Sequence, residues 1–269
     1  MQLPPQRLLQ GLVKHYLILD QKAAEQQAYR MFSDGNPGIV FHLRDPLMQW
    51  DEDRLLPQLQ PRSFVYGQLT HYNTIVSNGH LYMIVVVLEP HSLFTHFHIP
   101  AHELNDQTIP LEELSGQQAR DLEEQVLSAS SIDIAINNIE SFLLKLVMQF
   151  NNLTADISQA MKVIYQHGGI ITIENLLNKL PVTERQLERK FREYIGTTPK
   201  RFADTIKFQH LLKLFQKQTD KDKTAELIYK SGYYDQAHLV KNFRRMTGLT
   251  PTHYKATAQM LAINLMPLS

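Results

Sequence analysis

The 269-residue chain contains no cysteine, so neither a disulfide nor a thiolate-bound metal site can form. It also lacks a long apolar run. The longest run, Met83 to Leu88, is far shorter than the ~20 residues that a membrane-spanning helix needs. The first residues do not combine a charged segment with an apolar one, as an export signal does. These absences predict a cytoplasmic protein with no membrane partner.

Signatures of catalysis are missing as well. The sequence has no phosphate-cradling glycine loop, no Gly-x-Ser-x-Gly nucleophile elbow and no thiol nucleophile. We therefore expect that the protein is not an enzyme and that it needs no cofactor.

The chain has no net charge overall, but its N-terminal and C-terminal parts carry opposite net charges. Lys plus Arg and Asp plus Glu each number 27, which gives a formal net charge of zero. Residues 155–269 nevertheless hold 18 basic against 10 acidic residues, whereas residues 1–154 hold 9 against 17. A basic C-terminal part suits binding to a phosphate backbone, because neutralised phosphates release counterions. A solvated helical surface is the simpler alternative.

The C-terminal part contains an internal repeat, in which the same sequence pattern occurs twice. Each copy has a Leu, a Phe, a Gly, a Pro and a second aromatic residue, and corresponding residues lie 52 positions apart. The pairs are Leu187 with Leu239, Phe191 with Phe243, Gly196 with Gly248, Pro199 with Pro251 and Phe202 with Tyr254. Matches at one constant offset predict two copies of one structural unit.

Each copy has the signals of a helix-turn-helix unit. Thr183 and Gln186 form a capping box that opens the second helix of the first unit, and Asp235 can cap the equivalent helix of the second. A further helix from Pro199 to about Gln216 is expected to join the units and to set their spacing. The units are predicted at about residues 172–196 and 224–248, with second helices over 184–194 and 235–246.

These residues resemble the C-terminal signature of AraC/XylS-type transcriptional regulators, a bacterial family. The matching runs are Thr183–Phe191, Gly196–Pro199, Ser231–Phe243 and Gly248–Tyr254. The resemblance implies a homeodomain-like DNA-binding domain made of both units. Leu239 stands where the family often has Phe, Ala237 where it often has Ser, and Pro181 lies in the first turn. None of these departures removes an element of the fold.

The N-terminal part carries mainly strand signals. Its short runs of β-branched and aromatic residues are Val13–Leu19, Ile39–Leu43, Ser63–Leu69 and Leu81–Leu88. The dipeptide Asn78-Gly79 predicts a hairpin between Thr74–Val76 and the last of these runs. We therefore expect a small antiparallel barrel or sandwich.

Helices are predicted after the strands, over Leu111–Ala129 and Ser131–Phe150, from apolar residues at three-and-four spacing. The polar stretch Asn151–Ala155 predicts a boundary between domains 1–152 and 153–269. The fold class is α+β with two domains: a β-rich N-terminal domain with trailing helices, and an all-α C-terminal domain with two helix-turn-helix units.

Two segments of the N-terminal part, Phe32–His42 and Pro110–Gly116, resemble the sensory domains that precede this DNA-binding pair in one branch of the family. The resemblance implies a cupin-like barrel with a sensory or dimerising role.

One group of residues there is a candidate metal site. His96, His98 and Glu103 have the spacing of the metal-binding stretch in cupins, and two histidines alternating on a strand would face one side of a barrel. The flanking glycines of that motif are absent, and Pro100–Leu104 has the pattern of a helix start, which would carry Glu103 away. The prediction is therefore no metal, with these three residues as the alternative.

By the same resemblance, exposed faces of the two second helices are expected to contact DNA. Arg can bind guanine, Gln adenine and Glu cytosine, while Ala and Val can pack on a thymine methyl. The predicted base contacts are Arg185, Glu188, Arg189, Gln236, Ala237, Val240 and Lys241. The predicted phosphate contacts are Arg192, Lys200, Arg201, Arg244, Arg245 and Thr250. An alternative for Glu188 is an ion pair with Arg185 or Arg192.

The sequence thus predicts a transcriptional regulator that binds double-stranded DNA in adjacent major-groove segments. Its further candidate partners are a small-molecule effector, a second copy of the chain and RNA polymerase. One alternative is a metal-binding cupin-type enzyme or sensor fused to a DNA-binding module. Another is a helical adaptor that uses the repeat to bind proteins.

Overall fold

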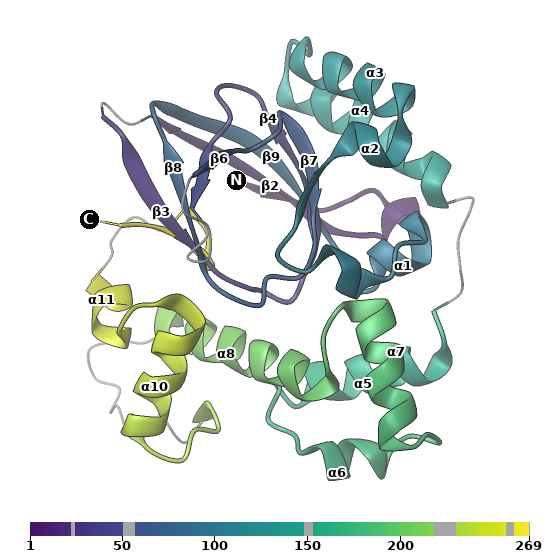
Figure 1. Cartoon of the computed structure of the whole chain (residues 1–269), viewed down its shortest axis with the longest axis vertical. Coiled ribbons are helices and arrows are strands. Elements are labelled where there is room, and N and C mark those ends of the chain that lie inside the picture. The colour runs from purple at the N-terminus through teal and green to yellow at the C-terminus, as the bar shows by residue number, and fades with distance from the viewer. Residues whose placement is uncertain (23–24, 51–56, 148–152, 218–229, 257–260, 269) are drawn as a thin grey trace.

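The computed structural model describes residues 1–22, 25–50, 57–147, 153–217, 230–256 and 261–268. Two antiparallel sheets face each other in the N-terminal part, and a group of helices lies against one of them (Figure 1). The C-terminal helices form a separate layer beneath the sheets. This is the α+β arrangement that the sequence predicts.

The sheets are antiparallel throughout. The first runs in the spatial order β1 (Gln2–Leu3), β2 (Val13–Lys22), β9 (His80–Leu88), β4 (Gly38–His42), β7 (Ser63–Tyr66) and β10 (Thr108–Pro110). The second runs in the order β11 (Leu265–Pro267), β3 (Gln27–Met31), β8 (Asn73–Ser77), β5 (Met48–Trp50) and β6 (Gln58–Leu59). Every predicted strand run contains a strand.

The first sheet is buried on both faces, and strand β9 shows this most clearly. Alternate side chains of a strand point to opposite faces. Ile84, Val86 and Leu88 pack with the neighbouring helices, whereas Met83, Val85 and Val87 pack with the second sheet. This double burial explains why the longest apolar run of the sequence is a strand.

The predicted hairpin at Asn78-Gly79 is wrong. The chain does turn there, but β8 pairs with β3 and β5 in the second sheet, whereas β9 pairs with β2 and β4 in the first. Neither Asn78 nor Gly79 has the positive φ that a type I′ hairpin turn requires. The turn therefore carries the chain from one sheet to the other.

Helices of the N-terminal part pack on the outer face of the first sheet. They are η1 (Arg7–Leu9), α1 (Ser92–Phe97), η2 (Ala101–Leu104), α2 (Leu111–Ser115), α3 (Gln117–Leu127) and α4 (Ile132–Val147). The single helix predicted over Leu111–Ala129 is wrong, because Gly116, with φ 55°, separates α2 from α3. The predicted helix from Ser131 is α4, and its last predicted residues lie outside the described part of the chain.

The C-terminal helices are α5 (Ala155–Gln166), α6 (Ile173–Leu177), α7 (Glu184–Ile195), α8 (Pro199–Lys217), α10 (Gln236–Thr247) and α11 (Pro251–Ala256). Helix α5 has no counterpart among the predictions. The first helix of the second predicted unit, expected over Thr224–Lys230, lies outside the described residues except for Lys230. No helix within the described segments is long and apolar enough to cross a membrane.

Helix α8 belongs to two hydrophobic cores. Phe202 and Ile206 pack in the core of the first unit with Phe191, whereas Phe208 and Leu212 pack in the core of the second unit. Because these residues lie on different sides of the helix, α8 has apolar side chains in more than one direction. It therefore fixes the two units relative to each other.

The C-terminal helices are held against the N-terminal part by specific contacts. The rings of Phe94 and Tyr194 lie 4.3 Å apart, and Gln209 Nε2 donates a hydrogen bond to the Ser33 carbonyl at 2.9 Å. After α11 the chain returns to the second sheet, where β11 pairs with β3. A strand that comes after the C-terminal helices thus lies in the N-terminal sheet, across the predicted domain boundary.

Candidate nucleic-acid interface

The first predicted reading helix, α7, begins as the sequence predicts. The Thr183 side chain accepts a hydrogen bond from the Gln186 backbone, and the Gln186 side chain accepts one from the Thr183 backbone at 3.0 Å. The helix ends at Gly196, whose φ is 88°. Leu187 and Phe191 are fully buried. These features fix which face of α7 points outward.

The second helix predicted to contact DNA, α10, is built in the same way. The Asp235 carboxylate accepts a hydrogen bond from the His238 backbone N–H at 2.7 Å and caps the helix. Gly248, with φ 72°, ends it. Leu239 and Phe243 are buried, as their counterparts are in α7. The repeat in the sequence is therefore a repeat in the structure.

The predicted base contacts lie on the outer faces of these helices. Five of these side chains are exposed and two are partly buried. The exposed ones are Arg185, Arg189, Gln236, Ala237 and Lys241, and the partly buried ones are Glu188 and Val240. Glu188 forms no ion pair within the described segments, so its pairing with a neighbouring arginine is not seen. Contact of these residues with bases remains a prediction.

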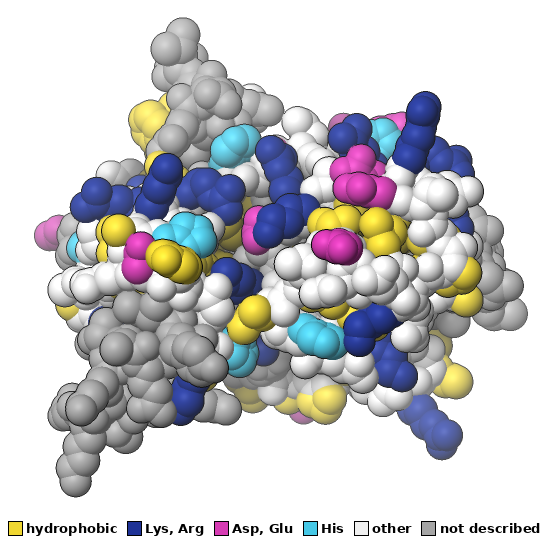
Figure 2. Space-filling model, turned by 90° about the horizontal axis from the view of Figure 1, so that it is seen from below, with side chains coloured by type: hydrophobic (Ala, Val, Ile, Leu, Met, Phe, Trp, Pro, Cys, Tyr) yellow, Lys and Arg dark blue, Asp and Glu magenta, His cyan; other side chains and the backbone are white. Residues whose placement is uncertain are grey.

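The predicted phosphate contacts surround the same helices. Arg192, Arg201, Arg244 and Arg245 are exposed. Lys200 is exposed too and forms an ion pair with Asp204 at 3.2 Å. The Thr250 hydroxyl accepts a hydrogen bond from the His253 backbone at 3.2 Å and so caps α11. The molecule seen from below carries Lys and Arg side chains over both helical units (Figure 2).

A basic groove between α8 and α10 was not predicted as a unit. It has a volume of about 350 Å³ and is lined by Lys200, Asp204, Lys207, Tyr233, His238, Lys241, Asn242 and Arg245. Lys207 Nζ donates a hydrogen bond to the Gly232 carbonyl at 2.7 Å and lies 4.3 Å from the centre of the Tyr233 ring. Burial lowers the pKa of Lys207. Only the three-dimensional pairing of α8 with α10 reveals this groove.

An ion pair anchors α7 to α5. Lys190 Nζ lies 2.7 Å from Asp156 Oδ2, and both side chains are largely buried. Burial alone would raise the pKa of the Asp156 carboxyl, but the hydrogen bond from Lys190 and smaller favourable contacts hold it below its usual value. Helix α5, which the sequence did not predict, therefore supports α7.

The two units rest on different parts of the N-terminal domain. The end of α7 packs on α1 and η2, and Asn105 Nδ2 donates a hydrogen bond to the Gly196 carbonyl at 2.6 Å. The end of α10 meets the second sheet instead. There, Gly248 lies beside Tyr72 and Arg30, and the Arg30 guanidinium lies 4.4 Å from the centre of the Tyr72 ring.

The strand geometry expected for the alternative metal site at His96, His98 and Glu103 is wrong. His96 lies in helix α1, His98 is its left-handed C-cap and Glu103 lies in η2, so the histidines do not alternate on a strand. Burial lowers the pKa of His96 to about 4, and its Nδ1 lies 2.8 Å from the Thr95 hydroxyl. The described residues contain no group of three potential ligands placed for a metal ion.

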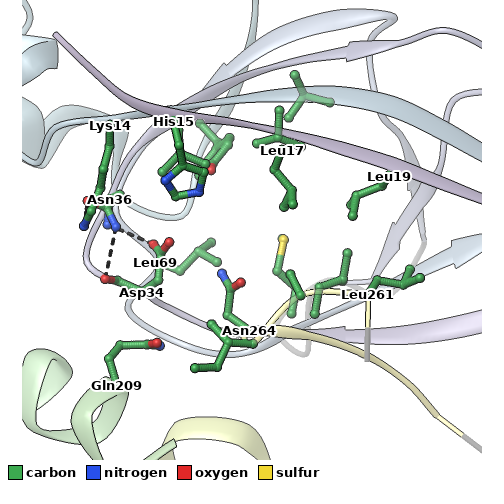
Figure 3. Close-up of a pocket in the computed structure, with 18 of the residues that line it drawn as sticks. Lys14, His15, Leu17, Leu19, Asp34, Asn36, Leu69, Gln209, Leu261 and Asn264 are labelled. Atoms are coloured by element: carbon green, nitrogen blue, oxygen red, sulfur yellow. Dashed lines mark hydrogen bonds between the residues drawn. The ribbon is translucent and has the colours of Figure 1, made fainter. Parts of the chain in front are cut away.

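A cavity of about 730 Å³ lies between the two sheets and opens toward α8. Apolar side chains from both sheets line its inner part, including Leu17, Leu19 and Leu265. Its other end is polar, where Lys14, His15, Asp34, Asn36 and Gln209 gather (Figure 3). Lys14 Nζ donates a hydrogen bond to Asn36 Oδ1 at 3.2 Å.

Comparison with known protein families finds a match for the C-terminal part of the chain. A family model described as a helix-turn-helix domain matches residues 176–257, which contain α7 and α10. The C-terminal part is an AraC-type helix-turn-helix domain. Residues 1–110 match DUF6597, a domain of unknown function. A comparison with curated proteins finds no match.

Solved structures similar to this chain include ToxT from Vibrio cholerae. One ToxT structure is 11% identical, with a TM-score of 0.51 over 89% of this chain and 97% of ToxT. ToxT with a bound unsaturated fatty acid is 13% identical, with a TM-score of 0.48 over 89% and 94%. The AraC-like activator CuxR is 14% identical, with a TM-score of 0.32 over 80% and 81%. The first of these shows a shared two-domain fold.

Proposed function

We propose that this AraC-type protein is a transcriptional regulator that binds double-stranded DNA sequence-specifically through α7 and α10 and catalyses no reaction. The observation that carries the proposal is the repeated unit itself. Both reading helices are capped, backed by a closed core and faced with exposed side chains that suit base edges and phosphates. In a bacterial cell such a regulator acts in the cytoplasm, where the chromosome lies.

The distance between the units supports reading of adjacent major-groove segments. Helix α8 has 19 residues and is therefore about 28 Å long. Successive major-groove faces on one side of DNA lie roughly 34 Å apart. A modest bend of the duplex would bring both helices into register.

Selection of a random duplex library by the purified protein tests this proposal. We expect a two-part motif in which Arg189→Ala relaxes one half and Lys241→Ala the other, at a cost of about 1–3 kcal/mol each. Arg120→Ala, which removes an exposed cation on α3, is the matched control and should leave the motif unchanged. Absence of any enriched motif from wild type would refute sequence-specific binding.

We further propose that the cavity binds a small amphipathic effector. Its inner part is apolar and its mouth is polar, so a molecule with an apolar body and a polar head would suit it. Gln209, His210 and Lys213 of α8 line the same cavity, so an occupant would touch the DNA-binding part directly. Exposed Leu127 and Ile134, near the α3–α4 turn, offer a surface for a second copy or for RNA polymerase.

Thermal unfolding with ligands of one chain length tests the effector site. Decanoate, decylamine and decanol differ in the charge of the head, and we expect at least one of them to raise the unfolding temperature. Val85→Trp, which fills the cavity from β9, should abolish that increase. An equal increase in the variant would place the binding elsewhere, and no increase with any of the three would contradict an amphipathic effector.

A further inference from the structure

Strand β11 lies at the edge of the second sheet and pairs with β3. We call these two neighbouring strands the ribbon. In the antiparallel register, Leu265 faces Met31 and Met266 faces Arg30. Hydrogen bonds extend the pairing beyond the strands. Phe32 N–H donates to the Asn264 carbonyl at 3.2 Å, and Leu268 N–H donates to the Ala28 carbonyl at 2.8 Å. The ribbon thus ties the end of the chain to the N-terminal domain.

The two faces of this ribbon belong to different cores. Paired residues point to the same face, and successive residues to opposite faces. Leu265 and Met31 face inward, and both line the cavity. Met266 and Phe32 face outward and are fully buried in the core of the second helix-turn-helix unit. The ribbon is therefore a wall shared by the cavity and that unit.

The outward face of the ribbon contacts the second unit at several points. The Phe32 ring lies 5.9 Å from the Phe208 ring and 6.4 Å from the Tyr254 ring, in edge-to-face geometry. The Tyr254 hydroxyl donates a hydrogen bond to the Ile263 carbonyl, just before β11, at 3.0 Å. Arg30 lies beside Gly248 at the end of α10. Movement of the ribbon would therefore displace α10 and α11.

The first unit meets the cavity through α5 and α8, where the Tyr165 ring packs on the Phe202 ring at 5.8 Å, rather than through the ribbon. Its reading helix α7 rests on α1 and η2, and no residue of α1, η2 or α7 lines the cavity. Among the described residues of the first unit, the cavity is lined by Tyr165 of α5, by Gly168 just after it and by Ile206 of the shared helix α8. On the ribbon side the cavity is lined by the consecutive residues Leu261, Ala262, Ile263, Asn264 and Leu265. Figure 3 shows Leu261 and Asn264 among them.

We infer that the β3–β11 ribbon couples the cavity to the second helix-turn-helix unit, so that occupancy of the cavity regulates the second half of the DNA site selectively. This inference rests on the proposed DNA binding and on the proposed effector site. The physical reason is that a ligand which shifts Leu265 or Met31 must shift Met266, Arg30 and Phe32 with them, because the same backbone carries both faces. A packed core responds to such a shift by repacking rather than by continuous deformation.

Adding bulk to the cavity from the ribbon tests the coupling without a known ligand. Leu265→Trp places an indole on the inward face, whereas Leu17→Trp places the same group in the same cavity from the first sheet. Hydrogen exchange is measured in residues 236–256 and 184–195. DNA affinity is measured on operators with either half scrambled. Met266→Ala, which loosens the outward face directly, is the third variant.

We expect Leu265→Trp and Met266→Ala to speed exchange in residues 236–256 and to weaken the contribution of the second half-site by about fivefold or more. Exchange in residues 184–195 and the contribution of the first half-site should stay within about twofold. Leu17→Trp fills the cavity away from the ribbon, so its effect should be smaller than that of Leu265→Trp and should also fall on the second unit. If Leu265→Trp fails to fold, judged by its thermal transition, Leu265→Phe replaces it.

Equal effects on the two units, no effect of either ribbon variant, or a larger effect of Leu17→Trp on the first unit than on the second would overturn the coupling. Failure of the proposed function looks different. In that case the wild-type protein selects no DNA motif, while the exchange measurements still report whether the ribbon moves α10.

Discussion

Phe243→Ala is expected to lower the free energy of unfolding by about 3–5 kcal/mol, because it removes the central ring of the second core. Phe243 is fully buried, and its ring centre lies 5.1 Å from that of Phe208 and 5.5 Å from that of Tyr254. Urea unfolding followed by circular dichroism measures the loss. Binding to the second half of the DNA site should disappear with it.

Two further variants serve as controls for this result. Arg244→Ala changes the adjacent exposed residue and should alter stability by no more than about 0.5 kcal/mol. Phe191→Ala opens the equivalent position of the first core and should remove the other half of the site. A loss below about 1 kcal/mol for Phe243→Ala would mean that the second core is not closed as described.

Gly169→Ala is expected to lower the stability by about 3 kcal/mol or more, from two separate costs. Gly169 has φ 75°, a conformation that strains any residue with a side chain. A methyl group there would also collide with the Ala203 carbonyl oxygen and the Lys207 amide nitrogen of α8. Because these are backbone atoms, α8 would have to move away from α5. Thermal and urea unfolding measure the effect.

Gly11→Ala separates the two costs. Gly11 has φ 97°, but a methyl group there would meet nothing within 4 Å. We expect this variant to lower the free energy of unfolding by only about 1–2 kcal/mol, which is the conformational cost alone. Equal losses at the two positions would show that the collision with α8 is relieved at no cost.

Helices α7 and α10 of the C-terminal domain were predictable because their signals are local. The capping box at Thr183, the cap at Asp235 and the left-handed glycines 196 and 248 each act within one turn of helix, and all are present in the structure. The repeat added a second, independent signal for the same elements. Exposure of the predicted contact residues followed from the positions of the buried Leu and Phe.

The errors arose where distant parts of the chain decide the structure. Asn78-Gly79 does turn the chain, but sheet pairing sends its flanking strands apart. The His96 motif has a spacing that suits a strand, although these residues begin the helical layer over the first sheet. No local pattern indicates that Leu265–Pro267 pairs with β3, more than 200 residues away. The cavity depends on that pairing, so the sequence did not predict the cavity either.

Helix α8 also constrains how the protein can change in evolution. Its residues serve the first core on one side and the second core on another. Each residue added to an α-helix rotates the remainder of the helix by about 100°, so a single insertion would turn the second unit away from the face that the first one uses. An insertion of about seven residues nearly restores the rotation and lengthens the helix by about 10 Å. The phase of α8, more than its length, therefore limits which arrangements of half-sites descendants of this protein can acquire.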